Sequence, residues 1–207
     1  MNEELLALRP GKTALLAIDM QKGFLDPDAA IKVTINQESI SNVKSLMKKC
    51  REISIPIVYI QFIYSPQIPN LVGKFWPQHE KDQCCVLGHA SCDIIDELKP
   101  EKSDTIIQKH GYDAFYGSSL DYKLRASEIT HLIITGVTTD VCVFATVCGG
   151  FHLEYKMTIA EDGVAATSLQ RHQASLEILR RNFGRVIPIR EILGEIEGWN
   201  HVQEGRP

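Results

Sequence analysis

The sequence predicts a three-layer α/β domain over residues 1–207, in which helices cover both faces of a six-stranded, mostly parallel sheet. Two observations predict this fold. Short apolar runs alternate with helical patterns along the chain, and the connections between them are mostly local. The apolar runs are continuous, as in TALLAI and HLIITGV, which is typical of strands that are buried on both faces of a parallel sheet.

Six segments have this strand-like character. Each is a short apolar run bounded by polar or turn-forming residues. In chain order they are residues 13–19, 55–63, 104–109, 131–137, 156–162 and 185–189.

The segments between the strands predict helices. In the first of them, Ile40, Val43, Met47 and Cys50 recur at steps of three and four, which is one face of an amphipathic helix. The long segment 64–88, with three prolines, favours a functional loop over a structureless connection. The expected helices are residues 36–53, 92–100, 118–127, a helix that starts near Cys142, and residues 168–183.

Composition and charge exclude several classes of protein. The chain is 44% hydrophobic and 23% charged, which is ordinary for a globular domain. A net charge of −4 gives no reason to expect nucleic acid or an anionic membrane as a partner. No apolar run reaches the roughly 18 residues of a membrane span, and the N-terminus does not resemble a signal peptide. We expect a cytoplasmic protein whose six cysteines form no structural disulfide.

Three polar side chains follow the ends of expected strands. The first strand ends at Asp19, the third at Lys109, and the fourth at Gly136, six residues before Cys142. Because parallel strands deliver their carboxyl ends to one edge of the sheet, we expect a carboxylate, an ammonium and a thiol to meet there.

These three groups can perform nucleophilic chemistry. A thiolate is favoured at a helix N-terminus and near a lysine, and Asp19 could take the thiol proton and return it to a leaving amine. The turn GVTTDV directs backbone N–H groups at the same place and could form an oxyanion hole. Spacing alone leaves simpler interpretations open, since a cysteine in an apolar helix is usually core packing and a strand-terminal Asp often only forms a turn.

The three segments resemble the isochorismatase-like cysteine hydrolases, a superfamily that includes nicotinamidases, N-carbamoylsarcosine amidase, biuret hydrolase and ureidoacrylate amidohydrolase. The resemblance lies in LLAIDMQKGF, IIQKHGYDAF and IITGVTTDVCV and spans roughly residues 12–192. It implies a Rossmann-like strand order and a homodimer or homotetramer. It also implies catalytic roles for Asp19, Lys109 and the nucleophile Cys142.

The resemblance carries further expectations about the site. It implies a cis peptide bond between Val137 and Thr138, and an oxyanion hole made by the N–H groups of Thr138 and Cys142. We expect substrate contacts from the following side chains near these motifs: Gln21, Phe24 and Tyr112.

Three differences from members of this superfamily stand out, and the first two narrow the expected reaction. The segment after the second strand lacks the Asp-x-His motif of nicotinamidases, so we expect neither nicotinamide as substrate nor a bound metal. True isochorismatases lack the nucleophilic cysteine, so Cys142 argues against vinyl-ether hydrolysis. The segment after Cys142, VFATVCGG, also differs from the Glu-Ser-Thr and Arg-Asp pattern of many relatives.

A second group of cysteines has an undetermined role. It consists of Cys84, Cys85, His89 and Cys92, with His79 nearby. Zinc sites prefer two cysteines separated by two to four residues, so adjacent cysteines favour loop packing over a metal site.

The sequence therefore predicts a cofactor-independent cysteine hydrolase that cleaves a C–N bond of a small amide, carbamoyl or ureido compound. Two alternatives remain open, namely a catalytically silent binding protein with this fold and a thiol-redox protein using Cys142 and Cys148. The second requires two cysteines that a helix places on different faces.

Overall fold

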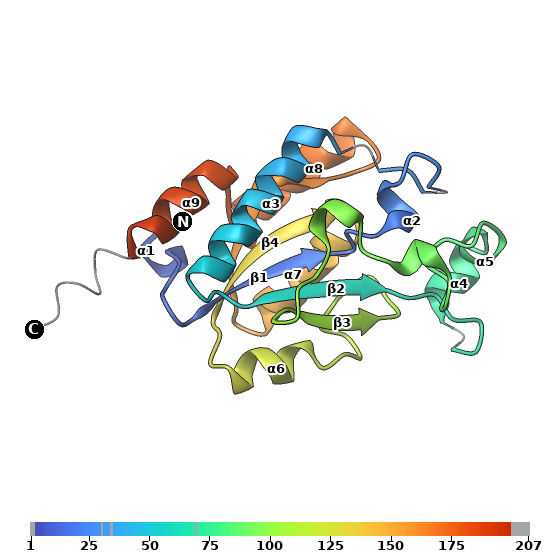
Figure 1. Ribbon diagram of the computed structural model, residues 1–207, viewed down its shortest axis with the longest axis horizontal. Helices are drawn as coiled ribbons and strands as arrows, with labels where there is room; N and C mark the ends of the chain where they lie inside the picture. Colours follow the sequence, from blue (N-terminus) through green and yellow to red (C-terminus); the bar gives the residue numbers. More distant parts are fainter. Residues whose placement is uncertain (1–2, 30, 34, 69, 200–207) are drawn as a thin grey trace, which may run out of the picture.

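The central sheet has six strands, all parallel, in the order β3-β2-β1-β4-β5-β6. The computed structural model describes residues 3–29, 31–33, 35–68 and 70–199 (Figure 1). The expected α/β class and strand order are confirmed. The strands are β1 (Thr13–Ile18), β2 (Ile57–Phe62), β3 (Thr105–Lys109), β4 (His131–Val137), β5 (Lys156–Ala165) and β6 (Gly184–Ile187).

The strand order changes direction between β1 and β4. From β1 the chain moves outward through β2 to β3, and it then returns to β4 and moves the other way. Such a switch point leaves a crevice outside the carboxyl ends of the two central strands, which is where ligands bind in open α/β sheets. Asp19 follows β1 and Cys142 begins the helix after β4, so the fold brings two of the expected residues to this crevice.

The helices and helical turns lie between and beyond the strands. The α-helices are α1 (Glu3–Leu6), α2 (Lys22–Leu25), α3 (Gln37–Glu52), α4 (Leu71–Phe75), α5 (Gln78–Lys81), α6 (Leu120–Ala126), α7 (Cys142–His152), α8 (Leu169–Asn182) and α9 (Ile189–Glu197). Two 3₁₀ turns are η1 (Ala90–Cys92) and η2 (Asp96–Leu98).

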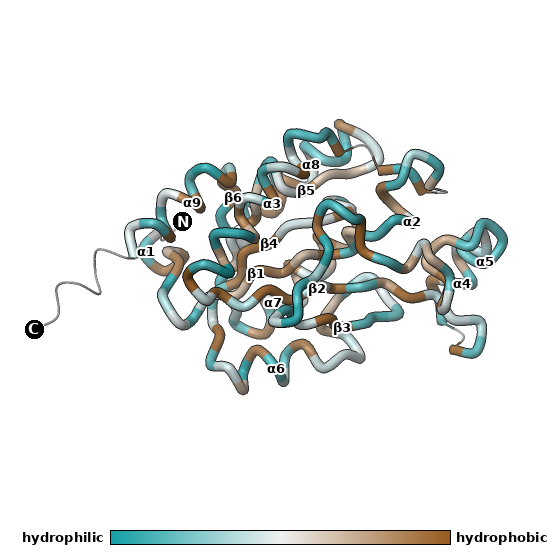
Figure 2. The backbone as a smooth tube through the Cα atoms, viewed as in Figure 1, coloured by the Kyte–Doolittle hydropathy of each residue, from teal (hydrophilic) through white to brown (hydrophobic). Residues whose placement is uncertain are grey.

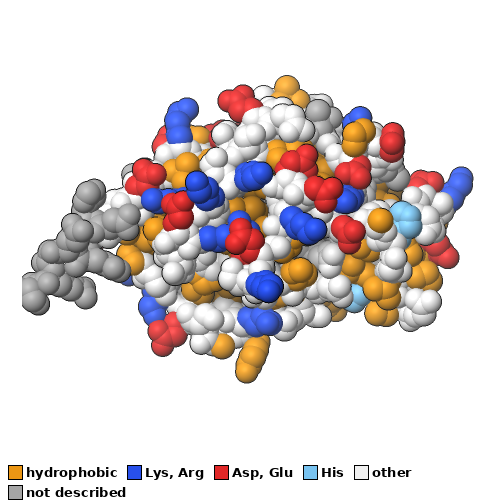
Figure 3. All heavy atoms as spheres, viewed as in Figure 1, with side chains coloured by type: hydrophobic (Ala, Val, Ile, Leu, Met, Phe, Trp, Pro, Cys, Tyr) orange, Lys and Arg blue, Asp and Glu red, His pale blue; other side chains and the backbone are white. Residues whose placement is uncertain are grey.

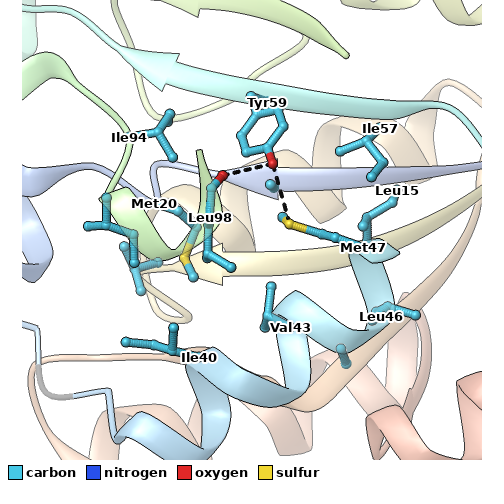
Figure 4. Packing of buried hydrophobic residues seen from close by; sticks show 14 of the residues in the cluster. Leu15, Met20, Ile40, Val43, Leu46, Met47, Ile57, Tyr59, Ile94 and Leu98 are labelled. Carbon is cyan, nitrogen blue, oxygen red and sulfur yellow. Dashed lines mark hydrogen bonds between the residues drawn. The ribbon is translucent and has the colours of Figure 1, made fainter. Parts of the chain in front are cut away.

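One face of the sheet is covered by α3 and α9. Figure 4 shows Val43 and Met47 of α3 facing Leu15 of β1, with Tyr59 of β2 above them. The Tyr59 hydroxyl donates a hydrogen bond to the carbonyl of Leu98 at 2.8 Å, so this buried polar atom is satisfied. Truncating a buried leucine such as Leu15 to alanine in a core of this kind costs about 2–5 kcal/mol of stability.

The opposite face packs against α6, α7 and α8. Leu16 and Ile18 of β1 point to this side, where they share a cluster with Val143 and Val147 of α7 and with residues of α6 and α8. Figure 2 shows hydrophobic central strands and outer helices of mixed hydropathy. Successive side chains of a strand point to opposite faces of the sheet, and both faces are buried. The strand sequences are therefore apolar without interruption.

One sequence prediction was wrong, and the last expected strand is shorter than predicted. The expected helix at 92–100 is two 3₁₀ turns, because the backbone between them pairs with the segment after β1: Lys22 N–H donates to Asp93 O at 2.8 Å and Ile95 N–H to Met20 O at 3.0 Å. The expected strand 185–189 ends at Ile187, and α9 begins at Ile189 after Pro188.

Charges on the surface are of mixed sign. Figure 3 shows basic and acidic side chains interspersed over the face that α3 covers, whereas hydrophobic side chains gather near α4. Leu71 and Phe75 of α4 are 73% and 74% exposed. Within the described residues, no helix combines the length and the hydropathy needed to cross a membrane.

Candidate active site

Asp19 is held at the end of β1 by an unusual backbone conformation. Its φ is 52°, in the left-handed region that non-glycine residues adopt rarely. Its N–H donates to Ile60 O at 2.9 Å and its carbonyl accepts from Gln21 N–H at 2.7 Å. These bonds fix the strained backbone, and the side chain is buried, with 1% of its surface exposed.

Lys109, the last residue of β3, forms a buried ion pair with Asp19. Its Nζ lies 2.8 Å from Asp19 Oδ2, and its side chain has no exposed surface. The ammonium also donates to the carbonyls of Gly111 and Tyr112, each at 3.0 Å. Its three N–H groups therefore have three acceptors, which keeps the buried charge compensated.

Cys142 approaches this pair because β4 passes very close to β1. Gly136 of β4 has a φ of +121°, and a Cβ there would lie 2.0 Å from the carbonyl oxygen of Ile18. Only glycine permits this approach. The peptide bond between Val137 and Thr138 is cis, at the position that the resemblance implies. Cys142 then begins α7, and its thiol interacts with both Asp19 and Lys109.

Burial and charge shift the pKa values of the three groups together. Burial raises the pKa of Asp19 more than the neighbouring Lys109 lowers it. Burial also raises the pKa of the Cys142 thiol, and Lys109 only partly offsets this. For Lys109, burial acts downward, but the charges of Asp19 and Cys142 outweigh it and raise its pKa. The structure thus favours a neutral thiol at rest, whereas the helix N-terminus and the lysine had suggested a thiolate.

Backbone N–H groups of the turn that leads into Cys142 lack a hydrogen-bond partner among the described residues. The N–H groups of Thr138, Asp140 and Cys142 donate no hydrogen bond to any described residue, whereas Val143 N–H donates to Thr138 O at 3.1 Å and Thr139 N–H to Ala165 O at 2.8 Å. Unpaired donors at the start of a helix are available to an anionic oxygen.

The thiol and the carboxylate open onto a cavity of about 390 Å³. Phe24 and Tyr112, expected to contact the substrate, both line it. Its other lining residues come from the ends of β1, β2 and β4, from the segment after α2, from the loop after β2, and from the starts of α7 and α8. They are Asp19, Ile31, Phe62, Trp76, His79, Asp82, Cys84, Val137, Thr138, Asp140, Val141, Cys142, Thr167 and Arg171.

Gln21 lies outside the cavity lining, so the expectation that it contacts the substrate is corrected. Its side chain is fully buried, its Nε2 donates to the carbonyls of Phe62 and Cys92 at 2.9 Å each, and its Oε1 accepts from Phe62 N–H at 2.8 Å. These bonds occupy the amide and tie the end of β2 to η1. Gln21 therefore positions the cavity wall.

The cysteine group of residues 84–92 divides into separate environments. His89 is exposed and its Nδ1 lies 2.9 Å from Ser91 Oγ, whereas the three cysteines are buried. Cys92 donates to Val86 O at 2.9 Å, and Cys85 approaches Ser91 O at 3.6 Å. Among the described residues, no three potential metal ligands gather in an arrangement that could hold an ion. Cys84 alone of these cysteines lines the cavity.

Sequence reasoning missed the contacts that fix the Lys109 loop. Ala114 N–H donates to Thr146 Oγ1 of α7 at 3.0 Å, and a Cβ on Gly149 would lie 2.5 Å from Asp113 Oδ2. The glycine pair in VFATVCGG was the only sequence feature that indicated close packing of this loop on α7. It lets the loop pack directly on α7.

Arg171 and Asp140 at the cavity were also missed, because nothing in their spacing marks them. Arg171 Nη1 lies 3.9 Å from Asp140 Oδ2, and the Arg171 side chain is 68% exposed. Asp140 Oδ1 is buried without a hydrogen-bond partner among the described residues. The cavity thus carries a cationic group and an available acceptor away from the Asp19–Lys109 pair.

Comparison with known proteins shows how this arrangement is related to others. The isochorismatase domain matches residues 13–191. A ureidoacrylate amidohydrolase RutB from Pseudomonas savastanoi pv. phaseolicola is 32% identical, covering 77% of this chain and 73% of the relative. The RutB of Pseudomonas syringae pv. syringae is 30% identical, covering 86% of this chain and 78% of the relative.

Solved structures show the same architecture. A cysteine hydrolase from Pseudomonas syringae pv. phaseolicola 1448A superposes with a TM-score of 0.88 at 26% identity, covering 93% of this chain and 95% of that one. N-carbamoylsarcosine amidase from Thermoplasma acidophilum gives a TM-score of 0.74 at 25% identity, covering 86% and 96%. The matched domain spans all six strands and the whole of the site described above, and this chain belongs to the isochorismatase family.

Proposed function

We propose that this hydrolase cleaves a C–N bond of a small amide, carbamoyl or ureido compound through a thioester on Cys142. The observation that carries the proposal is the contact of the Cys142 thiol with the buried Asp19–Lys109 pair, at the wall of a cavity. A nucleophile beside a base that a third group orients is the general arrangement of covalent catalysis.

The first step moves a proton from sulfur to oxygen. The raised pKa of Cys142 keeps the thiol protonated at rest, and the raised pKa of Asp19 makes its carboxylate a better proton acceptor. As the sulfur attacks the substrate carbonyl, an S–C bond forms, the carbonyl π electrons move to oxygen, and Asp19 takes the thiol proton. Lys109 remains charged and stabilises the negative charge that is shared between the two.

The developing oxyanion needs donors that are already in place. The N–H groups of Thr138 and Cys142 lie on the cavity wall and are among the donors that have no partner within the described part of the chain. In oxyanion holes of this kind, loss of one donor raises the barrier by roughly 2.7–4 kcal/mol. We assign the oxyanion hole to these two groups.

The remaining steps return the enzyme to its starting state. Asp19 gives its proton to the leaving nitrogen, the C–N bond breaks, and ammonia or an amine departs. Water then attacks the thioester while Asp19 takes one of its protons, the C–S bond breaks, and the proton returns to sulfur. No cofactor enters this sequence of steps.

The relatives' names make ureido acids the first substrates to test. An acid of this type presents a carboxylate at one end and a ureido group at the other. Arg171 at the cavity mouth can pair with the carboxylate, because its contact with Asp140 at 3.9 Å is loose. Arg171→Gln is expected to raise KM for carboxylate-bearing substrates at least tenfold with little change for neutral amides, from the roughly 1.5–3 kcal/mol of a charged hydrogen bond. An equal effect on both classes would remove this assignment.

Ammonia release from a panel of amides, carbamoyl compounds and ureido acids tests the reaction class. We expect release by the wild type and by Cys148→Ala, which keeps every residue of the Asp19–Lys109–Cys142 group, and none by Cys142→Ala. Binding without release in the wild type would favour the silent binding protein. Undiminished release by Cys142→Ala would refute the nucleophile. The cytoplasmic location and the homodimer or homotetramer expected from the sequence remain predictions.

A further inference from the structure

The cavity beside Cys142 has two walls of different chemistry. The turn after β4 and the start of α8 supply two valines and the polar side chains Thr138, Asp140, Thr167 and Arg171. The opposite side is built by α2, the segment that follows it, and the loops after β2 and β3 (Figure 1). We call this side the apolar wall, and it consists of Phe24, Ile31, Phe62, Trp76 and Tyr112. Asp19 and Cys142 follow the two central strands, so the reacting groups lie between the two walls.

The apolar wall begins beside the buried ion pair and extends to the cavity mouth. The ring centroid of Phe62 lies 5.4 Å from Lys109 Nζ and 6.3 Å from the ring centroid of Phe24. Both phenylalanines are buried, whereas Trp76 is 49% exposed. A large indole that borders a cavity and remains half exposed gains burial when an apolar ligand covers it.

The polar groups on this side are either occupied or exposed to solvent. His79 Nδ1 lies 3.2 Å from the carbonyl oxygen of Cys84, and the Cys84 thiol donates to Gly23 O at 3.4 Å. Asp82 is exposed. The wall therefore offers contact area but few hydrogen-bond partners. Water beside such a surface is poorly held, so an apolar group that displaces it gains affinity.

The cavity is larger than a ureido acid without a side chain requires. Its volume of about 390 Å³ corresponds to about 13 water molecules at roughly 30 Å³ each. The simplest ureido acids have fewer non-hydrogen atoms than that, and bonded atoms occupy less volume than separate water molecules. With the ureido group at Cys142 and the carboxylate at Arg171, the unfilled part of the cavity lies along the apolar wall.

We propose that the preferred substrates are N-carbamoyl amino acids with a bulky apolar side chain, such as that of leucine. This proposal rests on the hydrolysis proposed above. In such a compound the carboxylate and the side chain leave the same carbon, next to the ureido nitrogen, so one reaches Arg171 while the other contacts the apolar wall. The ureido carbonyl is then attacked by Cys142. The overall reaction consumes water and yields the free amino acid, ammonia and carbon dioxide.

A series of side chains of increasing size tests the proposal. Ammonia release is measured with the N-carbamoyl derivatives of glycine, alanine and leucine, the last two in both configurations. Because each buried methylene is worth about fourfold, kcat/KM for the better leucine derivative should exceed that for the glycine derivative by about tenfold or more. An equal or higher value for the glycine derivative would overturn this proposal and leave the hydrolysis standing. Absence of ammonia release from every ureido compound and amide would remove both.

Variants of the apolar wall locate the preference. Trp76→Ala and Ile31→Asn should each lower the leucine-to-glycine ratio of kcat/KM by about fourfold or more, the effect of one buried methylene. Both substrates are measured on one sample, so the ratio does not depend on the fraction of folded enzyme. The control is Phe75→Ala, because Phe75 neighbours Trp76 but is 74% exposed and does not line the cavity. Its ratio should equal that of the wild type.

Two results with these variants would contradict the assignment of the side chain to the apolar wall. One is a leucine-to-glycine ratio that neither Trp76→Ala nor Ile31→Asn changes. The other is an equal decrease of the ratio in Phe75→Ala.

Discussion

The substitution Lys109→Met removes the charge that compensates Asp19 while it keeps most of the buried lysine stem. The pair joins Nζ and Oδ2 at 2.8 Å with both side chains almost wholly buried, so water cannot replace the lost partner. Breaking a buried pair by removing one partner costs about 3–5 kcal/mol. The loss is a large part of the 5–15 kcal/mol that stabilises an ordinary domain, so the variant should fold but unfold at lower urea concentration.

The stability that Lys109→Met loses should increase as pH rises. Burial already raises the pKa of Asp19 above its ordinary value, and removal of Lys109 raises it further. A carboxyl whose pKa is higher in the folded than in the unfolded state loses stability as pH rises from the unfolded value, about 4, through the folded one. The deficit of Lys109→Met should therefore be small near pH 4 and large at pH 8.

Urea unfolding followed by circular dichroism at these two pH values measures the effect. The double variant Asp19→Asn, Lys109→Met carries neither charge and should regain most of the stability at pH 8. The free energy of unfolding of the double variant should also lack the extra loss between pH 4 and pH 8 that Lys109→Met shows. A single variant as stable as the wild type at pH 8, or equally destabilised at pH 4 and 8, would refute the description of the pair as a compensated buried charge.

Three other predictions concern the framework and the base. Gln21→Ala should lower the free energy of unfolding by about 1–3 kcal/mol for each buried group left unpaired, and it should raise KM. The control Gln108→Ala removes an exposed side chain and should change neither the melting temperature nor KM. Gly136→Ala should abolish soluble folding, because its Cβ would meet the backbone of β1. The control Gly194→Ala lies in α9 with open space around it, so its free energy of unfolding should increase by about 0.5–1 kcal/mol, measured by thermal unfolding. Because Asp19 must accept a proton, kcat/KM should fall as pH drops through its raised pKa; a flat acidic limb would contradict this.

The sheet and the meeting of Asp19, Lys109 and Cys142 could be predicted because they depend on local patterns and one topological rule. Continuous apolar runs mark buried parallel strands, and the carboxyl ends of such strands share an edge. Asp19 follows β1, Lys109 ends β3 and Cys142 begins the helix after β4, so all three were expected at one edge of the sheet. The resemblance to a known family was needed to favour this interpretation over core packing or a simple turn.

Other features depend on tertiary contacts that leave little trace in the sequence. The 92–100 segment has helical spacing, but backbone pairing of Asp93 and Ile95 with the chain after β1 prevents a helix. Gln21 has the chemistry of a substrate contact, and only its three hydrogen bonds reveal that it is occupied. Helix α9 was detectable, since Ile189, Ile192 and Ile196 lie at helical steps, but the apolar run before it suggested a longer strand.

The central claim is that Cys142 carries the acyl group during turnover. Acid quenching of the wild type within its first turnovers of a ureido acid, followed by peptide mass spectrometry, tests it directly. We predict a substrate-derived acyl adduct on the Cys142 peptide, absent from Cys142→Ser and removed by hydroxylamine. Turnover with no adduct on Cys142, together with undiminished ammonia release by Cys142→Ser, would contradict the account.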